Sequence, residues 1–235
     1  MTILSMAQQA CRRIGLASPS ALLSSTDDTY VQLVALANEE GEELAERFAW
    51  KALIKEATFT TVAAASQGAM TTLAGTDFKY IINDTIWNRT TRRPVFGPLA
   101  PRDWQALQAA PVTGPYHQFR IRIGNLYFNP TPSAGDSCAF EYLSKNWCQS
   151  SGGTGQSAWA ADTDTGVLDE QLMTAGLIWR WKQVKGLDYA EDYAKYERRV
   201  ADTMGRDGSR GVLDMAGGIT DYRPGLFVPQ GNWSL

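Results

Sequence analysis

Histidine is almost missing from this sequence, in which His117 is the only one among 235 residues. A metal site built from several imidazoles is therefore excluded. A Ser-His-Asp triad would have to use His117, which precedes a predicted strand in a sequence without a GxSxG motif. We interpret His117 as a surface or strand-edge residue. The sequence predicts no catalytic residue, no metal ligands and no cofactor.

Cysteine, net charge and long apolar runs are also scarce. Cys11, Cys138 and Cys148 form no CxxC pair and leave one over in any disulfide scheme, so we expect reduced, buried or inert thiols and folding in the cytoplasm. A net charge of −3 argues against a protein that holds nucleic acid through its overall field. No run reaches the ~18 apolar residues of a membrane span, and the N-terminus has the spacing of an amphipathic helix, so we expect neither a membrane partner nor a signal peptide.

Two short motifs are weak. Residues 153–158 fit the GxGxxA form of a dinucleotide loop, but no strand-helix-strand alternation surrounds them. Asp162, Asp164 and Gly166 partly match a calcium loop, but Met173 stands where the closing Glu belongs. We therefore expect residues 150–166 to form a flexible, solvated linker.

The middle of the chain predicts β structure. Apolar residues alternate with arginines from Phe119 to Ile123, which is the period of a strand with one buried face. Gly124-Asn125 predicts a tight hairpin turn, which places Ile121 opposite Phe128. Residues 137–147 predict a third strand, so we expect a three-stranded meander. One face of that third strand carries Cys138, Phe140 and Tyr142.

Helical patterns flank this β-rich region on both sides. Residues 2–14 and 26–52 predict two helices, and residues 168–204 predict a second pair. Gly41 lies on the buried stripe of its helix, which indicates a close helix crossing. The predicted fold is α+β: a helical bundle of residues 1–53 and 160–205, an inserted antiparallel β-rich domain of residues 54–159, and an extended C-terminal arm of residues 206–235.

Three groups of residues are candidates for contacts with other chains. Trp179 and Trp181 point about 200° apart on a helix that is apolar nearly all round, so we expect one to face the bundle and the other a neighbouring subunit. Arg89, Arg92 and Arg93 form the only dense basic cluster, suited to a phosphate or to a carboxylate across a subunit boundary. In the glycine-rich arm, the expected aromatic anchors are Tyr222, Phe227 and Trp233.

Two stretches, LYFNPTPSAGDSCAFEYLSKNW (126–147) and GLIWRWKQVKGLDYAEDYAKYE (176–197), carry a resemblance to a known group. They stand in the order helical hairpin, β-rich insertion, apolar helix pair and aromatic tail. In this the chain resembles the head-to-tail adaptor proteins of tailed bacteriophages, in particular the tail tubular protein A-like adaptors of short-tailed viruses. The likeness extends from the first helix to about Met204.

The resemblance implies a virion protein of the head-tail connection without catalytic activity. Twelve copies would form a ring between the portal protein and the tail nozzle, with further contacts to tail fibres. DNA would pass through the bore during ejection without sequence-specific binding, and the ring would be assembled in the host cytoplasm. Two alternatives are a virion-associated cell-wall hydrolase that uses a pair of carboxylates, and a carbohydrate-binding module with Trp87 or Trp147 as its stacking platform.

Overall fold

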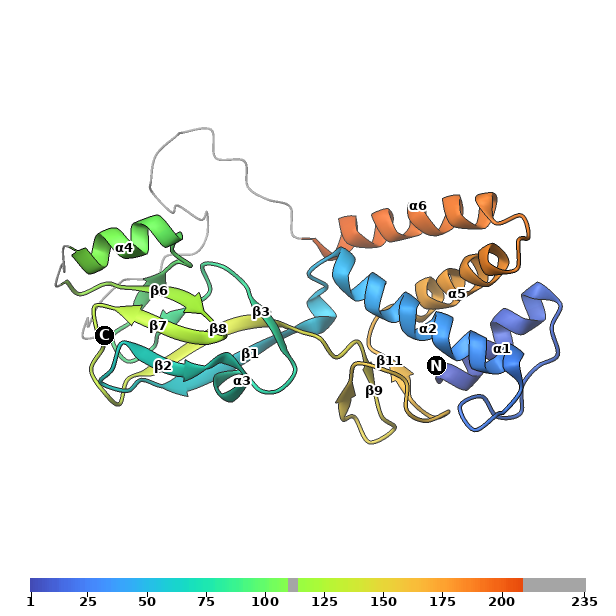
Figure 1. Cartoon of the computed structure of the whole chain (residues 1–235), viewed down its shortest axis with the longest axis horizontal. Coiled ribbons are helices and arrows are strands. Elements are labelled where there is room, and N and C mark those ends of the chain that lie inside the picture. Colours follow the sequence, from blue (N-terminus) through green and yellow to red (C-terminus); the bar gives the residue numbers. More distant parts are fainter. Residues whose placement is uncertain (110–113, 209–235) are drawn as a thin grey trace. The chain divides into compact units, whose positions relative to one another are not determined.

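The computed structural model describes residues 1–109 and 114–208 and has the predicted α+β fold (Figure 1). Contacts divide the described chain into two compact units. The helical unit comprises residues 1–54 and 144–208, and the β unit comprises residues 55–109 and 114–143. Residues 144–159, assigned to the β-rich domain from the sequence, thus group with the helices. Helix α6 ends at Asp207, and the expected arm lies outside the described residues from position 209 onward.

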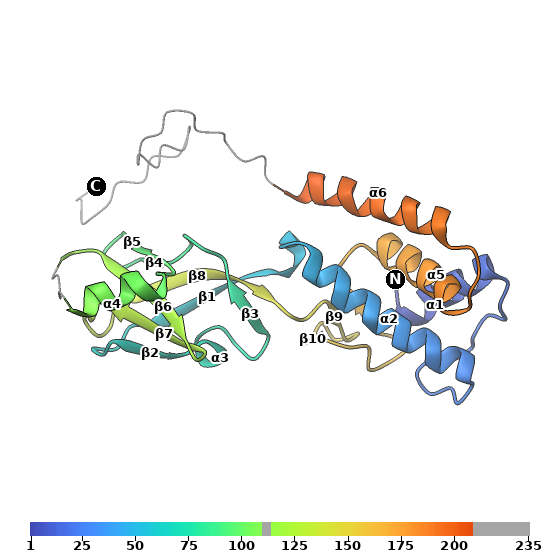
Figure 2. The ribbon, with the colours of Figure 1, turned by 45° about the horizontal axis from the view of Figure 1, so that its top comes forward.

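Helix α5 is the centre of the helical unit. It contacts three other helices, α1, α2 and α6, and it lies between them in Figures 1 and 2. The apolar side chains that encircle α5 are therefore covered by the same chain, and not by a neighbouring subunit as expected. The elements of this unit are α1 (Ile3–Ile14), α2 (Asp28–Arg47), the 3-10 helix η1 (Lys51–Leu53), β9 (Cys148–Gln149), β10 (Gly155–Gln156), β11 (Thr165–Gly166), α5 (Glu170–Val184) and α6 (Ala190–Asp207).

Side-chain caps fix where these helices begin. Thr2 accepts a hydrogen bond from the backbone N–H of Ser5 at the start of α1, and Asp27 accepts one from Thr29 at the start of α2. Asp169 accepts two, from Gln171 and the following residue, at the start of α5. Each cap satisfies N–H groups that have no partner within the first helical turn.

Two helical glycines admit a large side chain from another element. Gly41 of α2 lies under the indole of Trp147, to which an added Cβ would come within 2.3 Å. The close contact predicted at Gly41 is therefore made with a loop tryptophan and not with a helix. The close approach between two helices occurs at Gly176 of α5, where a Cβ would lie 2.0 Å from the carboxyl carbon of Glu40 in α2.

The stretch before α5 is folded, in contrast to the expected flexible linker. Strands β9, β10 and β11 form a small antiparallel sheet with β9 in the centre. Trp159 is buried edge-on against Trp147, with ring centroids 5.1 Å apart. Asp164 is also buried, and its carboxylate accepts hydrogen bonds of 2.8 Å from the backbone N–H groups of Ala160 and Ala161. Asp164 therefore holds the loop in its conformation and is not part of a solvated linker as expected.

The β unit is built on one eight-stranded sheet in the order β1-β8-β4-β5-β6-β7-β2, with β3 paired to β8. Neighbouring strands β5 and β6 run parallel, so the sheet is mixed and not purely antiparallel. Its elements are β1 (Ile54–Thr60), β2 (Ser66–Ala69), α3 (Met70–Leu73), β3 (Phe78–Ile81), β4 (Trp87–Asn88), β5 (Arg93–Phe96), α4 (Pro101–Ala109), β6 (His117–Arg122), β7 (Asn125–Asn129) and β8 (Ser137–Ser144).

The central hairpin exists, but its turn is shifted from the predicted one. Phe119 lies opposite Phe128 and Arg122 opposite Asn125, so the turn residues are Ile123 and Gly124. Both have positive φ, 49° and 70°. The predicted meander is also wrong, because β8 pairs with β4 and not with β7. The inward face of β8 is as expected: its three apolar residues are buried in the core of the unit, namely Cys138, Phe140 and Tyr142.

Candidate functional site

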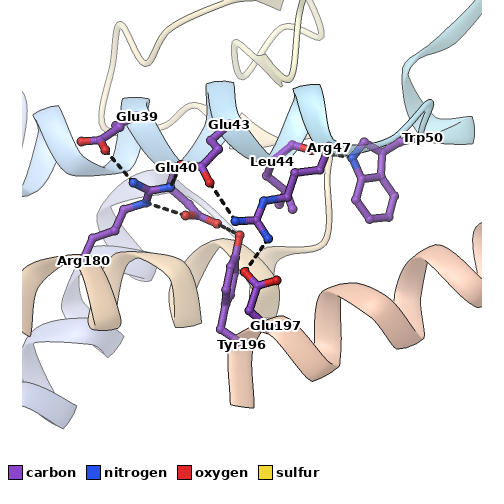
Figure 3. Close-up of polar contacts among 9 residues, drawn as sticks. All are labelled: Glu39, Glu40, Glu43, Leu44, Arg47, Trp50, Arg180, Tyr196 and Glu197. Carbon is purple, nitrogen blue, oxygen red and sulfur yellow. Dashed lines mark hydrogen bonds and ion pairs between the residues drawn. The ribbon is translucent and has the colours of Figure 1, made fainter. Parts of the chain in front are cut away.

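A charged network is buried among three helices of the helical unit (Figure 3). Its centre is the carboxylate of Glu40 in α2, whose relative exposure is 0%. Tyr196 of α6 donates its hydroxyl proton to Glu40 over 2.6 Å, and the Nε of Arg180 in α5 donates over 2.7 Å. The guanidinium of Arg180 also pairs with Glu39 and Glu43. One residue from each of α2, α5 and α6 thus meets at a single carboxylate.

A second ion pair extends this network along α2 and α6. Arg47 donates to Glu197 of α6 over 2.5 Å and to Glu43 of its own helix over 2.7 Å. Its guanidinium also lies 5.4 Å from the ring centroid of Tyr196, within reach of a cation–π interaction. Just beyond the end of α2, the indole N–H of Trp50 donates to the carbonyl of Leu44 over 2.7 Å.

Burial and hydrogen bonding shift the pKa values of this network in opposite directions. Burial raises the pKa of Glu40 to about 7, although Tyr196 and Arg180 both donate to the carboxylate. The hydrogen bond from Arg47, followed by that from Arg180, lowers the pKa of Glu43. Burial, together with the nearby Glu40, raises the pKa of Tyr196, which therefore stays a hydroxyl donor. The network is a structural clamp whose central acid can take up a proton near neutral pH.

Four exposed apolar or aromatic residues lie close together in the chain at the end of the same unit, around the turn between α5 and α6. They are between 37% and 52% exposed, which is a large fraction for apolar side chains so close together in the chain. The group, named here the turn cluster, consists of Val184, Leu187, Tyr189 and Tyr193. Tyr193 packs edge-on against the buried Trp179, with centroids 5.0 Å apart, so this member of the cluster is anchored to the interior of the unit.

The β unit presents a smaller aromatic cluster of its own. Phe96 and Tyr116 are both exposed, and their ring centroids lie 5.8 Å apart. The guanidinium of Arg93 lies 5.8 Å from the centroid of Tyr116. Such a combination of aromatic and arginine side chains is enriched at protein interfaces.

The two tryptophans predicted to face different partners are both inside the protomer. Trp179 is 6% exposed and Trp181 is 4% exposed. Trp179 packs against Tyr193 and Tyr196, and Arg180 lies 4.6 Å over its ring. Neither indole therefore offers the exposed surface expected of a subunit contact, although the two side chains leave the helix axis about 200° apart.

The predicted basic cluster is only partly brought together. Arg89 forms an exposed ion pair with Glu56 over 2.7 Å, and Arg92 adopts a positive φ of 54° in the turn before β5. Arg93 joins the aromatic cluster described above. The expected anchors of the arm lie outside the described residues: Tyr222, Phe227 and Trp233.

The other residues considered as candidates, His117, Trp147 and Trp87, contact or lie within the β sheet and the helical core. The Nδ1 of His117 lies 2.9 Å from the carbonyl of Pro130, and its ring stacks on Phe128. Trp147 is buried on Gly41 and cannot serve as a sugar-stacking platform, while Trp87 is half-buried in β4. Within residues 1–109 and 114–208, no cluster of His, Cys, Asp or Glu side chains suits a metal ion, and no helix is long and apolar enough to cross a membrane.

The cysteines are free and buried, as predicted. Burial raises the pKa of Cys138 and Cys148 to about 12, and it also raises the pKa of Cys11. The reactive thiolate is therefore scarce at neutral pH.

The sequence contains a sign of the buried network, although none of the predicted sites included it. Glu40 falls on the apolar stripe of α2 between Ala37 and Leu44. Arg180 stands between two tryptophans in the buried run 177–181 of α5, whose other members are apolar. A carboxylate and a guanidinium at such positions are buried only when they are paired. The two residues lie 140 positions apart in the chain, so the pairing required the fold.

A family model described as SU10 adaptor protein matches residues 1–218, which is most of the chain. The match places the protein in the class of phage adaptors, which are structural components of the virion. The chain belongs to the SU10 adaptor protein family. A search of curated proteins found no match. Membership implies contacts with other virion proteins such as those of the portal and tail, and it argues against an enzyme.

Proposed function

We propose that this chain is a head-to-tail adaptor whose copies form a ring between the portal protein and the tail nozzle, around the channel for DNA. The ring has twelve copies, its neighbours include tail fibres, and DNA passes through it without sequence-specific binding. Membership of the adaptor family gives the class of protein. The finer assignment rests on the resemblance and on the exposed surfaces described above.

The turn cluster is the observation that carries this proposal. Val184 and Leu187 are half-exposed at a helix-helix turn, where a monomer gains nothing from leaving them in water. The helices beneath are held by Arg180 and its carboxylates, so the cluster is presented on a preorganised support. A rigid end with exposed Tyr and aliphatic groups suits a permanent contact with a portal or tail protein.

The predicted arm adds a second contact in this proposal. Tyr222, Phe227 and Trp233 are large apolar anchors in a segment rich in glycine, which would fill pockets on the portal or on an adjacent copy. The first residues of the predicted arm, Arg206 and Asp207, belong to α6, and the N–H of Gly208 still bonds to the carbonyl of Met204. A chain cut after Gly208 should therefore fold as a protomer and lose stable binding to the portal.

A hydrolase has less support from the described residues. A hydrolase needs a general acid whose raised pKa keeps it protonated. Glu40 has such a raised pKa, but its side chain is buried between helices. Substrate could not reach it without the loss of the contacts with Arg180 and Tyr196.

Electron microscopy and mass photometry of the purified chain, with and without portal rings of the same phage, test the proposal. Rings or capped portals are expected, and a chain truncated after Gly208 should bind portals only weakly. If the chain instead stays monomeric, does not bind portals and cleaves peptidoglycan, the adaptor proposal is wrong and the hydrolase is the function.

A further inference from the structure

Helices α1, α2 and α6 surround α5, and a groove lies between two of them. Tyr196 and Glu40 close the gap between α2 and α6, but a groove of about 500 Å³ remains between α1 and α6. Ala175 and Ile178 of α5 line it. Arg13 of α1 and Arg199 of α6 line both this groove and an adjoining hollow.

Positive charge dominates the groove. Arg13 and Arg199 are exposed and make no ion pair within the described part of the chain. Of the two aspartates, Asp192 is already paired with Lys182, and of the cations Lys195 is paired with Glu191. Among the described residues, the lining groups without an ion pair are Arg13, Arg198 and Arg199 against Asp202, so the balance stays positive. The charged groups that line the groove are the cations Arg13, Lys195, Arg198 and Arg199 and the anions Asp192 and Asp202.

The outer face of α2 has the opposite character. Exposed residues recur there at helical spacing, beginning with Val31 and Ala35 and continuing as Glu39, Glu42 and Glu46. The three glutamates span about 10 Å along the helix axis. Glu42 makes no ion pair among residues 1–109 and 114–208, and Glu39 remains 60% exposed while it contacts Arg180. We call these three glutamates the acidic stripe.

The stripe and the groove are separate surfaces, since no described residue of α2 lines the groove or the adjoining hollow. One copy can therefore use both at once. A contact between two different surfaces of identical chains repeats head to tail, and it closes into a ring when the rotation per copy permits.

We propose that the acidic stripe of one copy docks on the groove between α1 and α6 of the next copy. This inference rests on the proposed ring and identifies the contact that builds it. The occupant is a second copy because the charges of the two surfaces are complementary and both lie on the same unit, where every copy presents both.

Charge reversal tests this pairing in the full chain. A stripe variant carries Glu42→Lys with Glu46→Lys, and a groove variant carries Arg13→Glu with Arg199→Glu. Each alone should weaken association between copies on the order of 100-fold, because like charges then face each other. A control with Asp103→Lys and Glu141→Lys, at exposed positions of the β unit, makes the same change in net charge as the stripe variant and should assemble normally.

An equimolar mixture of the two reversed variants is the decisive sample. Lys of one variant then meets Glu of the other, and the remaining wild-type surfaces also match, so alternating rings with an even number of copies should form. Mass photometry and negative-stain images measure assembly, and circular dichroism verifies folding of each variant.

Each outcome separates the contact from the function. Reversed variants that assemble alone as well as the wild type, a mixture that fails to assemble, or a control that also fails would overturn the contact while the adaptor function stands. If the wild-type chain forms no ring, alone or on portals, the proposed function itself is overturned.

Discussion

Replacement of Gly176 by alanine should break the buried network from within. The added Cβ would lie 2.0 to 2.4 Å from the carboxyl atoms of Glu40, closer than any real contact. A glutamate carboxylate normally swings away from such an intrusion. Here Tyr196 and Arg180 hold it, and both partners are buried. The helices must separate or the hydrogen bonds must lengthen.

The size of the effect follows from opposing terms. Overpacking of a filled interior costs about 1–3 kcal/mol, and loosening a buried ion pair costs up to about 3–5 kcal/mol when one partner is lost altogether. Alanine recovers about 1 kcal/mol of helix propensity. We expect a net loss of about 3 kcal/mol in the free energy of unfolding of the helical unit. For a chain of this length each kcal/mol corresponds to about 2–4 °C, so the melting temperature should fall by about 6–12 °C.

Gly205 supplies a matched control in α6, since a Cβ there meets no atom within 4 Å. Gly205→Ala should stabilise the unit by up to about 1 kcal/mol through helix propensity alone. Urea unfolding followed by tryptophan fluorescence compares the two variants. If Gly176→Ala is as stable as Gly205→Ala, the Glu40 carboxylate is not held between the helices by Tyr196 and Arg180.

Three further predictions concern single side chains. The pKa of Glu40 is about 7 in the folded state against an ordinary 4.5, so the folded state keeps a proton that the unfolded state releases; this group therefore stabilises the fold at low pH, and its contribution is lost as pH rises through about 7. At about 1.4 kcal/mol per pH unit, the loss is about 3 kcal/mol. Unfolding curves at pH 5 and 7.5 measure this loss, and Glu40→Gln should abolish it. Ile123→Asn should stabilise the β unit by about 1 kcal/mol, because asparagine tolerates the positive φ better than a β-branched residue; an unchanged or lower melting temperature would contradict the assigned turn. Trp179→Ala and Trp181→Ala should each cost about 3–5 kcal/mol, and a variant that melts like the wild type would show that its indole is not part of the core.

The hairpin illustrates what sequence periodicity can and cannot decide. Alternation correctly predicted the strands and their buried face, since Phe119 and Phe128 are both in the core. The predicted pairing of Ile121 with Phe128 differs from the observed one by two residues, and a shift of two keeps every side chain on its face. Only the turn could distinguish the two registers. Residue preferences for tight turns favoured Gly124 and Asn125 as the turn pair. In the structure the pair is Ile123 and Gly124, with the exposed Ile123 at a positive φ.

Sheet order was beyond the sequence for a related reason. The strand of residues 137–144 follows the hairpin after a short loop, which favours a meander. Its partners are instead β1, β3 and β4, which come from much earlier in the chain. Contacts between distant segments depend on how whole faces pack, and no local pattern in a single sequence records that choice. The same holds for the pairing of Glu40 with Arg180.

The two tryptophans of α5 show why an apolar helix does not by itself indicate oligomerisation. A helix with apolar residues in every direction requires cover in every direction, as the sequence pattern indicated. The cover is supplied by α1, α2 and α6 of the same chain, so both indoles are inside and their burial says nothing about a second copy. What can hold copies together must be sought among groups that the fold leaves in water. On the helical unit these are the apolar residues at the turn between α5 and α6, and the opposed charges of the acidic stripe and the groove between α1 and α6.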